Sequence, residues 1–134
     1  MRPSTLALAI GLLVGAGTLP VARANDASPA AIVPALPLFV VEFRTGPAWD
    51  PARPPQEQPR FREHSANLKK LRDEGRLQVG ARYADKGFIV LAAESLEQAR
   101  GWIDADPAVQ AGTFVYELHD FRVFYPGSLG APRR

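Results

Sequence analysis

Residues 61–93, FREHSANLKKLRDEGRLQVGARYADKGFIVLAA, decide the fold of this chain. In residues 61–74 the apolar positions recur at spacings of three and four and stop before a glycine, which predicts an amphipathic helix. Residues 77–83 and 87–93 are rich in strand-forming residues and are separated by a short polar turn, which predicts a β-hairpin. His64 belongs to the apolar stripe of the helix, so its side chain is expected to point inward.

A second helix and a last strand are expected after the hairpin. Residues 95–98, SLEQ, have the S-x-x-Q form of a capping box, and the apolar residues that follow predict a helix as far as Ala105. Pro107 then ends this helix. Residues 114–124, FVYELHDFRVF, predict a long strand that is covered on both faces. His119 in this strand is expected to lie on the surface or at an interface.

Residues 38–44, LFVVEFR, predict a first strand ahead of the first helix. The element order is then β-α-β-β-α-β, which indicates an α+β, ferredoxin-like fold with a four-stranded antiparallel sheet. Right-handed crossovers place both helices on one face of that sheet. The other face carries apolar residues that need a cover, and a second copy of the chain is the simplest one, so we expect a homodimer.

The segment between the first strand and the first helix is rich in proline. Residues 45–60 hold five prolines in 16 positions, which argues against helix and sheet and predicts a long surface loop. Such loops in small domains often serve as lids or partner contacts, and a tolerated insertion is an equal alternative. Trp49 in this loop is a candidate for closing over a pocket.

Residues 1–24 have the three parts of a secretory signal peptide, namely a basic start, a dozen apolar and small residues and an A-x-A site before Asn25. They predict a periplasmic or secreted protein. The apolar run is shorter than a membrane span, so no stable membrane insertion is expected after cleavage. The mature chain is then divided into a flexible arm at 25–36, a domain at 37–126 and a tail at 127–134.

Composition and charge exclude several classes of function. The chain of 134 residues has 16 Lys and Arg against 14 Asp and Glu. Loss of Arg2 and Arg23 with the signal leaves 14 of each, so the mature net charge is zero and no nucleic-acid partner is expected. The absence of cysteine excludes thiol catalysis and disulfides. With two histidines, any metal would need mostly carboxylate ligands, so we expect no metal. No cofactor is expected either, because the reaction proposed below needs none.

Chain direction in this fold predicts which polar residues meet. The start of the first helix and the end of the second share one edge, so His64 and Asp106 can come together. Arg44, at the end of the first strand, and Tyr83, near the end of the second, approach the same edge. Asp104 lies within the second helix and is expected to face solvent instead.

Two motifs carry a family resemblance across residues 38–126. The first is H-x3-L-x2-L-x3-G-x-L-x2-G, from His64 to Gly80, and the second is ESLEQARGW at 94–102 leading into DADP-x4-G. With these motifs the chain resembles the YCII-related (YciI-like) family, a branch of the dimeric α/β-barrel superfamily. The resemblance implies a ferredoxin-like fold, a dimer and a site centred on a histidine and an aspartate, here His64 and Asp106. Some relatives act on chlorinated aromatics as dehydrochlorinases, or process lactones.

Two hypotheses about function follow. An aspartate bonded to one ring nitrogen of His64 would fix the tautomer and raise the basicity of the other nitrogen. Such a base suits proton abstraction next to a carbonyl of a small cyclic or aromatic compound, in a lyase or isomerase step. Arg44 or Tyr83 would stabilise the oxyanion, and Gly80 completes the expected substrate-binding residues. Alternatively, His64 is a core residue satisfied by Asp106, and the chain is a non-catalytic module that binds a small ligand or a protein.

Overall fold

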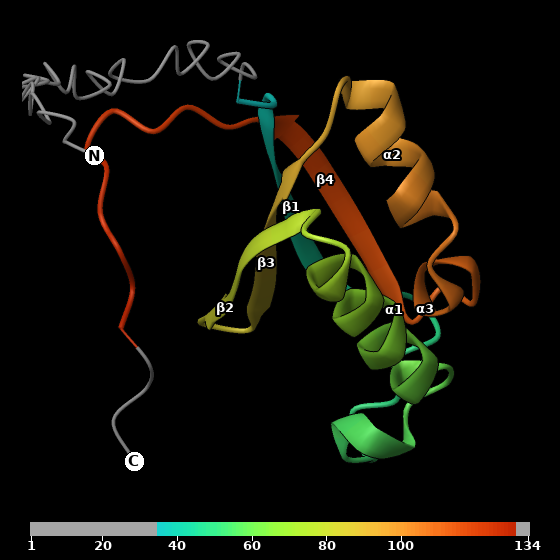
Figure 1. Cartoon of the computed structure of the whole chain (residues 1–134). Coiled ribbons are helices and arrows are strands. Elements are labelled where there is room, and N and C mark those ends of the chain that lie inside the picture. Colours follow the sequence, from blue (N-terminus) through green and yellow to red (C-terminus); the bar gives the residue numbers. More distant parts are fainter. Residues whose placement is uncertain (1–34, 131–134) are drawn as a thin grey trace, which may run out of the picture. The chain divides into compact units, whose positions relative to one another are not determined.

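The computed structural model describes residues 35–130 (Figure 1). In chain order the elements are β1 (Leu38–Thr45), the 3-10 helix η1 (Pro55–Glu57), α1 (Phe61–Asp73), β2 (Leu77–Tyr83), β3 (Lys86–Ala92), α2 (Leu96–Asp104), α3 (Pro107–Gln110) and β4 (Phe114–Asp120). No helix in this part of the chain has the length and apolar character needed to cross a membrane. The expected signal peptide, nearly all of the expected arm and the last residues of the tail lie outside the described residues.

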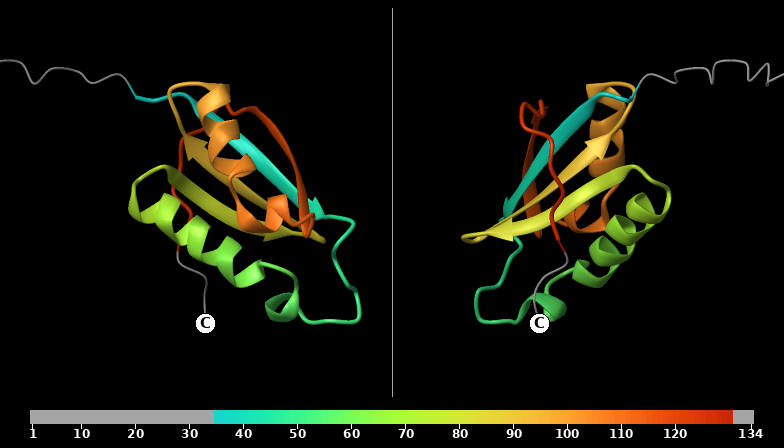
Figure 2. Two further views of the ribbon diagram at one scale, coloured as in Figure 1. Left: turned by 90° about the vertical axis from the view of Figure 1, so that its right-hand side faces the viewer. Right: turned by 60° about the vertical axis from the view of Figure 1, so that its left-hand side comes forward.

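The four strands form one sheet in the order β2-β3-β1-β4, and every neighbouring pair is antiparallel. This is the strand order of a ferredoxin-like fold, which confirms the predicted fold class. Both α1 and α2 lie on the same face of the sheet (Figure 2). The opposite face, called the open face below, carries alternate residues of all four strands: Val40, Glu42, Arg44, Val79, Ala81, Tyr83, Lys86, Phe88, Val90, Val115, Glu117 and His119.

The hydrophobic core lies between the sheet and the helices. Every second residue of β1 is buried on this side, namely Phe39, Val41 and Phe43. They form one cluster with Leu71 of α1 and Ile103 of α2, which is fully buried. Because both helices contribute to the same cluster as the central strand, the core fixes where the first turn of α1 stands on the sheet.

The ends of the two long helices follow local sequence signals. After α1, Gly75 adopts a left-handed φ of 73°, as expected for a glycine at a helix C-terminus. Before α2, Ser95 accepts a hydrogen bond from the Gln98 backbone N–H at 3.1 Å, as a capping box requires. The Gln98 side chain in turn accepts from the Glu94 backbone N–H. The predicted helices and hairpin are therefore confirmed.

Two predictions about the C-terminal half are wrong in detail. The chain does not simply exit after Pro107 but forms the short helix α3, with proline at its first position and Asp106 as its N-cap. Strand β4 ends at Asp120 instead of extending to residue 124. Strand β4 pairs with β1, and the Phe121 N–H donates to the carbonyl of Leu38, the first residue of β1. Beyond this point β1 offers no further backbone groups with which a longer β4 could pair.

The proline-rich loop is tied down on both sides and from within. Its start approaches the turn before β4 so closely that a Cβ on Gly46 would overlap the carbonyl oxygen of Gly112. Its end is held by the Thr113 hydroxyl, which donates to the Pro59 carbonyl at 2.6 Å. Between these points the buried Gln58 side chain donates to the Asp50 carbonyl at 2.6 Å. The prediction that prolines exclude all helix here is wrong, because η1 begins on a proline.

Candidate active site

His64 is held in an aromatic cage at the start of α1. It occupies the first turn of the helix and is buried. Its ring centroid lies 4.8 Å from that of Phe114 on β4, 5.3 Å from Phe43 on β1 and 6.3 Å from Phe61 on α1. The contact with Phe43 is edge-to-face. Three rings from three elements thus fix the plane of the imidazole.

Asp106, which precedes α3, contacts His64 on α1. Its Oδ1 atom lies 3.0 Å from Nδ1 of His64 and also accepts from the Ala108 N–H at 3.0 Å. Its Oδ2 atom accepts from Nδ2 of Asn67 at 2.7 Å. The Asp106 side chain is fully buried, so these donors replace water completely. The structure therefore brings together the two residues that the sequence placed at a common edge.

The charge on Asp106 determines which ring nitrogen of His64 carries the proton. Burial alone would raise the pKa of the Asp106 carboxyl, but the hydrogen bonds from His64, Asn67 and the Ala108 N–H outweigh it, and the pKa is lowered. An ionised carboxylate can only accept hydrogen bonds, so Nδ1 of His64 must carry a proton. When the imidazole is neutral, its lone pair is consequently on Nε2.

Nε2 of His64 is open to a ligand. Within residues 35–130, no fully buried side-chain nitrogen or oxygen lacks a hydrogen-bond partner. Nε2 makes no hydrogen bond to these residues, so it must keep accessible surface, and His64 lines a pocket of the fold. The atom that could act as a base therefore faces a cavity.

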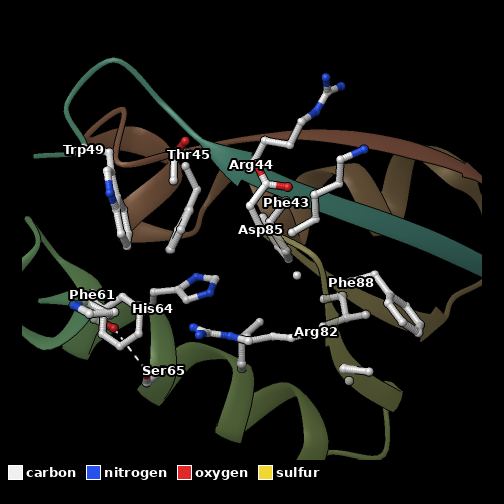
Figure 3. A pocket seen from close by; sticks show the side chains of 18 of the residues that line it. Phe43, Arg44, Thr45, Trp49, Phe61, His64, Ser65, Arg82, Asp85 and Phe88 are labelled. Carbon is white, nitrogen blue, oxygen red and sulfur yellow. Dashed lines mark hydrogen bonds between the residues drawn. The ribbon is translucent and has the colours of Figure 1, made fainter. Parts of the chain in front are cut away.

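The pocket lies between α1, the β2–β3 hairpin and the proline-rich loop (Figure 3). Its volume is about 440 Å³, within the range of small-molecule sites. Trp49 of the loop forms one wall, with its ring 5.7 Å from that of Phe114. Gly80 and Gly87 lie on the sheet side of the pocket, where the lack of side chains leaves space. The loop is thus a wall of the site.

The structure places the other expected binding residues differently. Gly80 lines the pocket, but the side chains of Arg44 and Tyr83 belong to the open face. Arg44 borders the pocket, yet its side chain points away from His64 (Figure 3) and forms an ion pair with Glu117. The Tyr83 hydroxyl donates to Glu42. Neither side chain is therefore placed to donate to a group bound beside His64.

Arg82 is the pocket residue that sequence reasoning missed. Simple alternation from Leu77, which packs on the core, puts Tyr83 on the helix side of the sheet. A β-bulge between Leu77 and Val79 reverses this order, so Gly80 and Arg82 face the helices instead. Arg82 lines the pocket, and its side chain points into it on the side of His64 (Figure 3).

The remaining polar residues lie away from the site. Asp104 is exposed and accepts a hydrogen bond from the Tyr116 hydroxyl at 2.5 Å. His119 is exposed on β4, 3.4 Å from Glu117. The part of the chain that the structure describes holds no group of three or more His, Asp or Glu side chains arranged to bind a metal ion.

The family model for the YCII-related domain matches residues 39–122, from β1 to just beyond β4. This chain belongs to the YCII-related domain family. The match includes His64, Asp106 and the whole pocket. No curated protein matches the sequence.

Among solved structures, the YCII-related chain is similar to 5-chloro-2-hydroxyhydroquinone dehydrochlorinase of Burkholderia phenoliruptrix AC1100, in complex with 2,5-dihydroxybenzoquinone. The two share 23% sequence identity with a TM-score of 0.44. The superposition covers 63% of this chain and 93% of the dehydrochlorinase.

Proposed function

We propose that this YCII-related protein is an enzyme that removes a proton next to a carbonyl group of a small cyclic or aromatic compound, without a cofactor. His64 is the base and Asp106 is its positioning residue. One observation carries the proposal: Nδ1 of His64 is bound to a buried, ionised Asp106, while Nε2 opens onto a cavity of about 440 Å³. A base oriented in this way is what general base catalysis requires.

The proposed step is a proton transfer from the substrate to His64. The C–H bond next to the carbonyl breaks, its proton binds to Nε2 of His64, and its electron pair moves into the carbonyl to form an enolate. Return of the proton to a different carbon gives an isomerase. Departure of a leaving group from the adjacent carbon, together with its bonding pair, gives a lyase. Both outcomes begin with the same proton abstraction. The site therefore supports proton abstraction next to a carbonyl as the reaction class, whichever substrate it takes.

The surroundings of His64 support this chemistry. Phe43, Phe61 and Phe114 exclude water from one side of the imidazole and hold it without competing for its protons. Asp106 stabilises the positive charge that develops on the ring when Nε2 takes a proton. Such an aromatic pocket also suits a module that binds a ligand without turning it over, which is the alternative function.

Hydrogen exchange tests the proposal without knowledge of the substrate. A panel of cyclic ketones, lactones and hydroxyquinones is incubated with the protein in D2O, and the signals of hydrogens next to each carbonyl are followed by proton NMR. We expect wild type to accelerate exchange for part of the panel and His64→Gln to lose the acceleration. His119→Gln changes the other histidine, which is exposed on the open face and outside the pocket lining. It is the matched control and should keep the exchange activity, and its sedimentation is compared with that of wild type because the open face is the proposed dimer interface.

The outcomes separate the two functions. Exchange that persists in His64→Gln would contradict the role of His64. If panel members bind but neither exchange nor turnover occurs in wild type, the chain is the non-catalytic binding module.

We also propose that the mature protein is exported and forms a homodimer through the open face of its sheet. The apolar run and A-x-A site before Asn25 support export. Exposed apolar side chains such as Val115, which is 45% exposed, support a partner on the open face. Mass spectrometry of the protein recovered from the periplasm or medium tests export, since cleavage after Ala24 leaves 110 residues.

A further inference from the structure

We propose that the pocket selects a small planar anion, namely an aromatic or cyclic acid whose ionised oxygen binds to the guanidinium group of Arg82. This inference names the substrate class of the site, so it rests on the proposed function. It assigns Arg82 as the residue that determines specificity.

The sheet register aims Arg82 into the pocket and leaves it room. Arg82 pairs with Gly87 on β3, two residues before the buried Ile89, so both residues of the pair face the helix side. A Cβ at Gly87 would meet no atom closer than 4.0 Å, so the space beside the Arg82 stem is open. The arginine therefore has room to bind an anion on the side of the cavity where His64 lies, toward which its side chain points (Figure 3).

The other cations that border the pocket are already neutralised. Arg44 pairs with Glu117, and Lys86 lies 3.0 Å from Glu42. Within residues 35–130, no carboxylate lies within ion-pair distance of Arg82, although Asp85 also lines the pocket. The donors of Arg82 are therefore available to an anion from outside the chain.

The walls specify the rest of the ligand. Trp49, Phe61 and Phe114 supply flat aromatic surfaces around His64, which suit a planar ring. A guanidinium binds a carboxylate through two parallel hydrogen bonds, which fixes the plane of the acid. A ring bound by Arg82 is thereby oriented in the same cavity as Nε2 of His64. The same charge would stabilise an enolate oxygen formed in the proposed step.

A matched pair of unreactive probes tests this assignment. Benzoate and benzamide have nearly the same shape and differ by one charge. We expect wild type to bind benzoate at least about tenfold more tightly than benzamide by calorimetry, because charge-assisted hydrogen bonds are stronger than neutral ones. Arg82→Gln should lose this preference, and Arg82→Lys should restore part of it.

Two variants with the same change of charge are controls. Arg62→Gln alters an exposed residue of α1 outside the pocket lining. Arg44→Gln alters a residue that borders the pocket but whose side chain pairs with Glu117 on the open face. Both should keep the preference for benzoate. Circular dichroism checks that every variant is folded, which is expected because Arg82 is itself exposed.

Three results would overturn the proposal: equal affinity of wild type for the two probes, binding of neither at millimolar concentration, or loss of the preference in Arg44→Gln instead of Arg82→Gln. The test also separates this inference from the proposed function. An Arg82-dependent preference in a protein without exchange activity would refute the enzyme and keep the anion site. Exchange activity in a protein whose benzoate affinity does not depend on Arg82 would keep the enzyme and refute the anion site.

Discussion

Nδ1 of His64 lies 3.0 Å from Oδ1 of Asp106, although 42 residues separate the two in the sequence. The same oxygen accepts from the Ala108 backbone N–H, and Asp106 is the N-cap of α3. The orientation of the imidazole is thus tied to the start of a helix from the other half of the chain. A carboxylate held by backbone and side-chain donors together cannot rotate without losing several bonds at once.

This contact fixes the tautomer of His64. We expect nitrogen-15 NMR of the wild-type protein, at a pH where His64 is neutral, to show the proton on Nδ1. In Asp106→Asn the charge that selects this tautomer is removed, so the Nε2–H form should gain population. The exposed His119 in the same spectrum is an internal reference. A wild-type His64 with its proton on Nε2 would contradict the arrangement.

Asp106 should also make stability depend on acid. The pKa of the Asp106 carboxyl is lowered in the folded protein. The ionised carboxylate therefore contributes its full stabilisation of the fold above the ordinary pKa of about 3.9, and this stabilisation is lost as the pH falls through the folded pKa. Asp106→Asn should therefore reduce the free energy of unfolding by roughly 1–3 kcal/mol at neutral pH, and the difference from wild type should shrink below about pH 4. Urea titrations at several pH values measure this. Asp85→Asn, which alters an exposed carboxylate, is the control. A stability difference between wild type and Asp106→Asn that grows as the pH falls would refute this role of Asp106.

The close approach of Gly46 to Gly112 gives a prediction about the proline-rich loop. A Cβ at Gly46 would overlap the backbone of Gly112, which cannot move aside cheaply. Gly46→Ala should destabilise the fold by about 2 kcal/mol or more. Gly101→Ala is the matched control, because a Cβ there meets nothing within 4 Å, and alanine in a helix should add about 0.5–1 kcal/mol of stability. Denaturant unfolding compares the two, and equal effects would contradict this account.

Gly80 allows the pocket to be narrowed without damage to the core. A Cβ at this position would lie 3.6 Å from Ile89, which is ordinary contact, so alanine fits. Gly80→Val should project further into the cavity and weaken binding of planar ligands by about tenfold, while Gly80→Ala has a smaller effect. Calorimetry with benzoate measures both variants. Unchanged affinity in Gly80→Val would place the ligand elsewhere.

The open face gives a prediction about assembly. We expect the mature protein to sediment as a dimer and Val115→Glu to shift it toward monomer, because a charge would be buried in the interface. Ala66→Glu, on the exposed side of α1, should remain dimeric. Analytical ultracentrifugation distinguishes these outcomes. A monomeric wild type at tens of micromolar would contradict the proposed dimer.

Much of the fold could be predicted because its signals are local. The capping box at Ser95 and the glycine at residue 75 mark helix ends through backbone geometry that few other residues provide. The meeting of His64 and Asp106 followed from chain direction alone. Asn67 could have been found as well, because it lies three residues after His64 on the same helix face.

The face presented by β2 could not be predicted from pattern. The bulge after Leu77 adds one residue to the strand and exchanges its two faces, so Arg82 enters the pocket and Tyr83 leaves it. The one sequence signal in LQVGARY is Gly80, since a glycine inside a strand often accompanies a bulge, but it does not say on which side of it the extra residue lies. Helix α3 was missed for a related reason, since a proline that ends one helix can equally begin the next.

The two clamps on the proline-rich loop have a consequence for protein engineering. The Gly46–Gly112 contact and the Thr113–Pro59 hydrogen bond fix both ends of the segment independently of what lies between them. Residues 47–58 can therefore serve as an exchangeable cassette, in which libraries of different length and sequence remodel the wall around Trp49. The contact between His64 and Asp106 is built on α1 and α3 and includes no residue of this cassette.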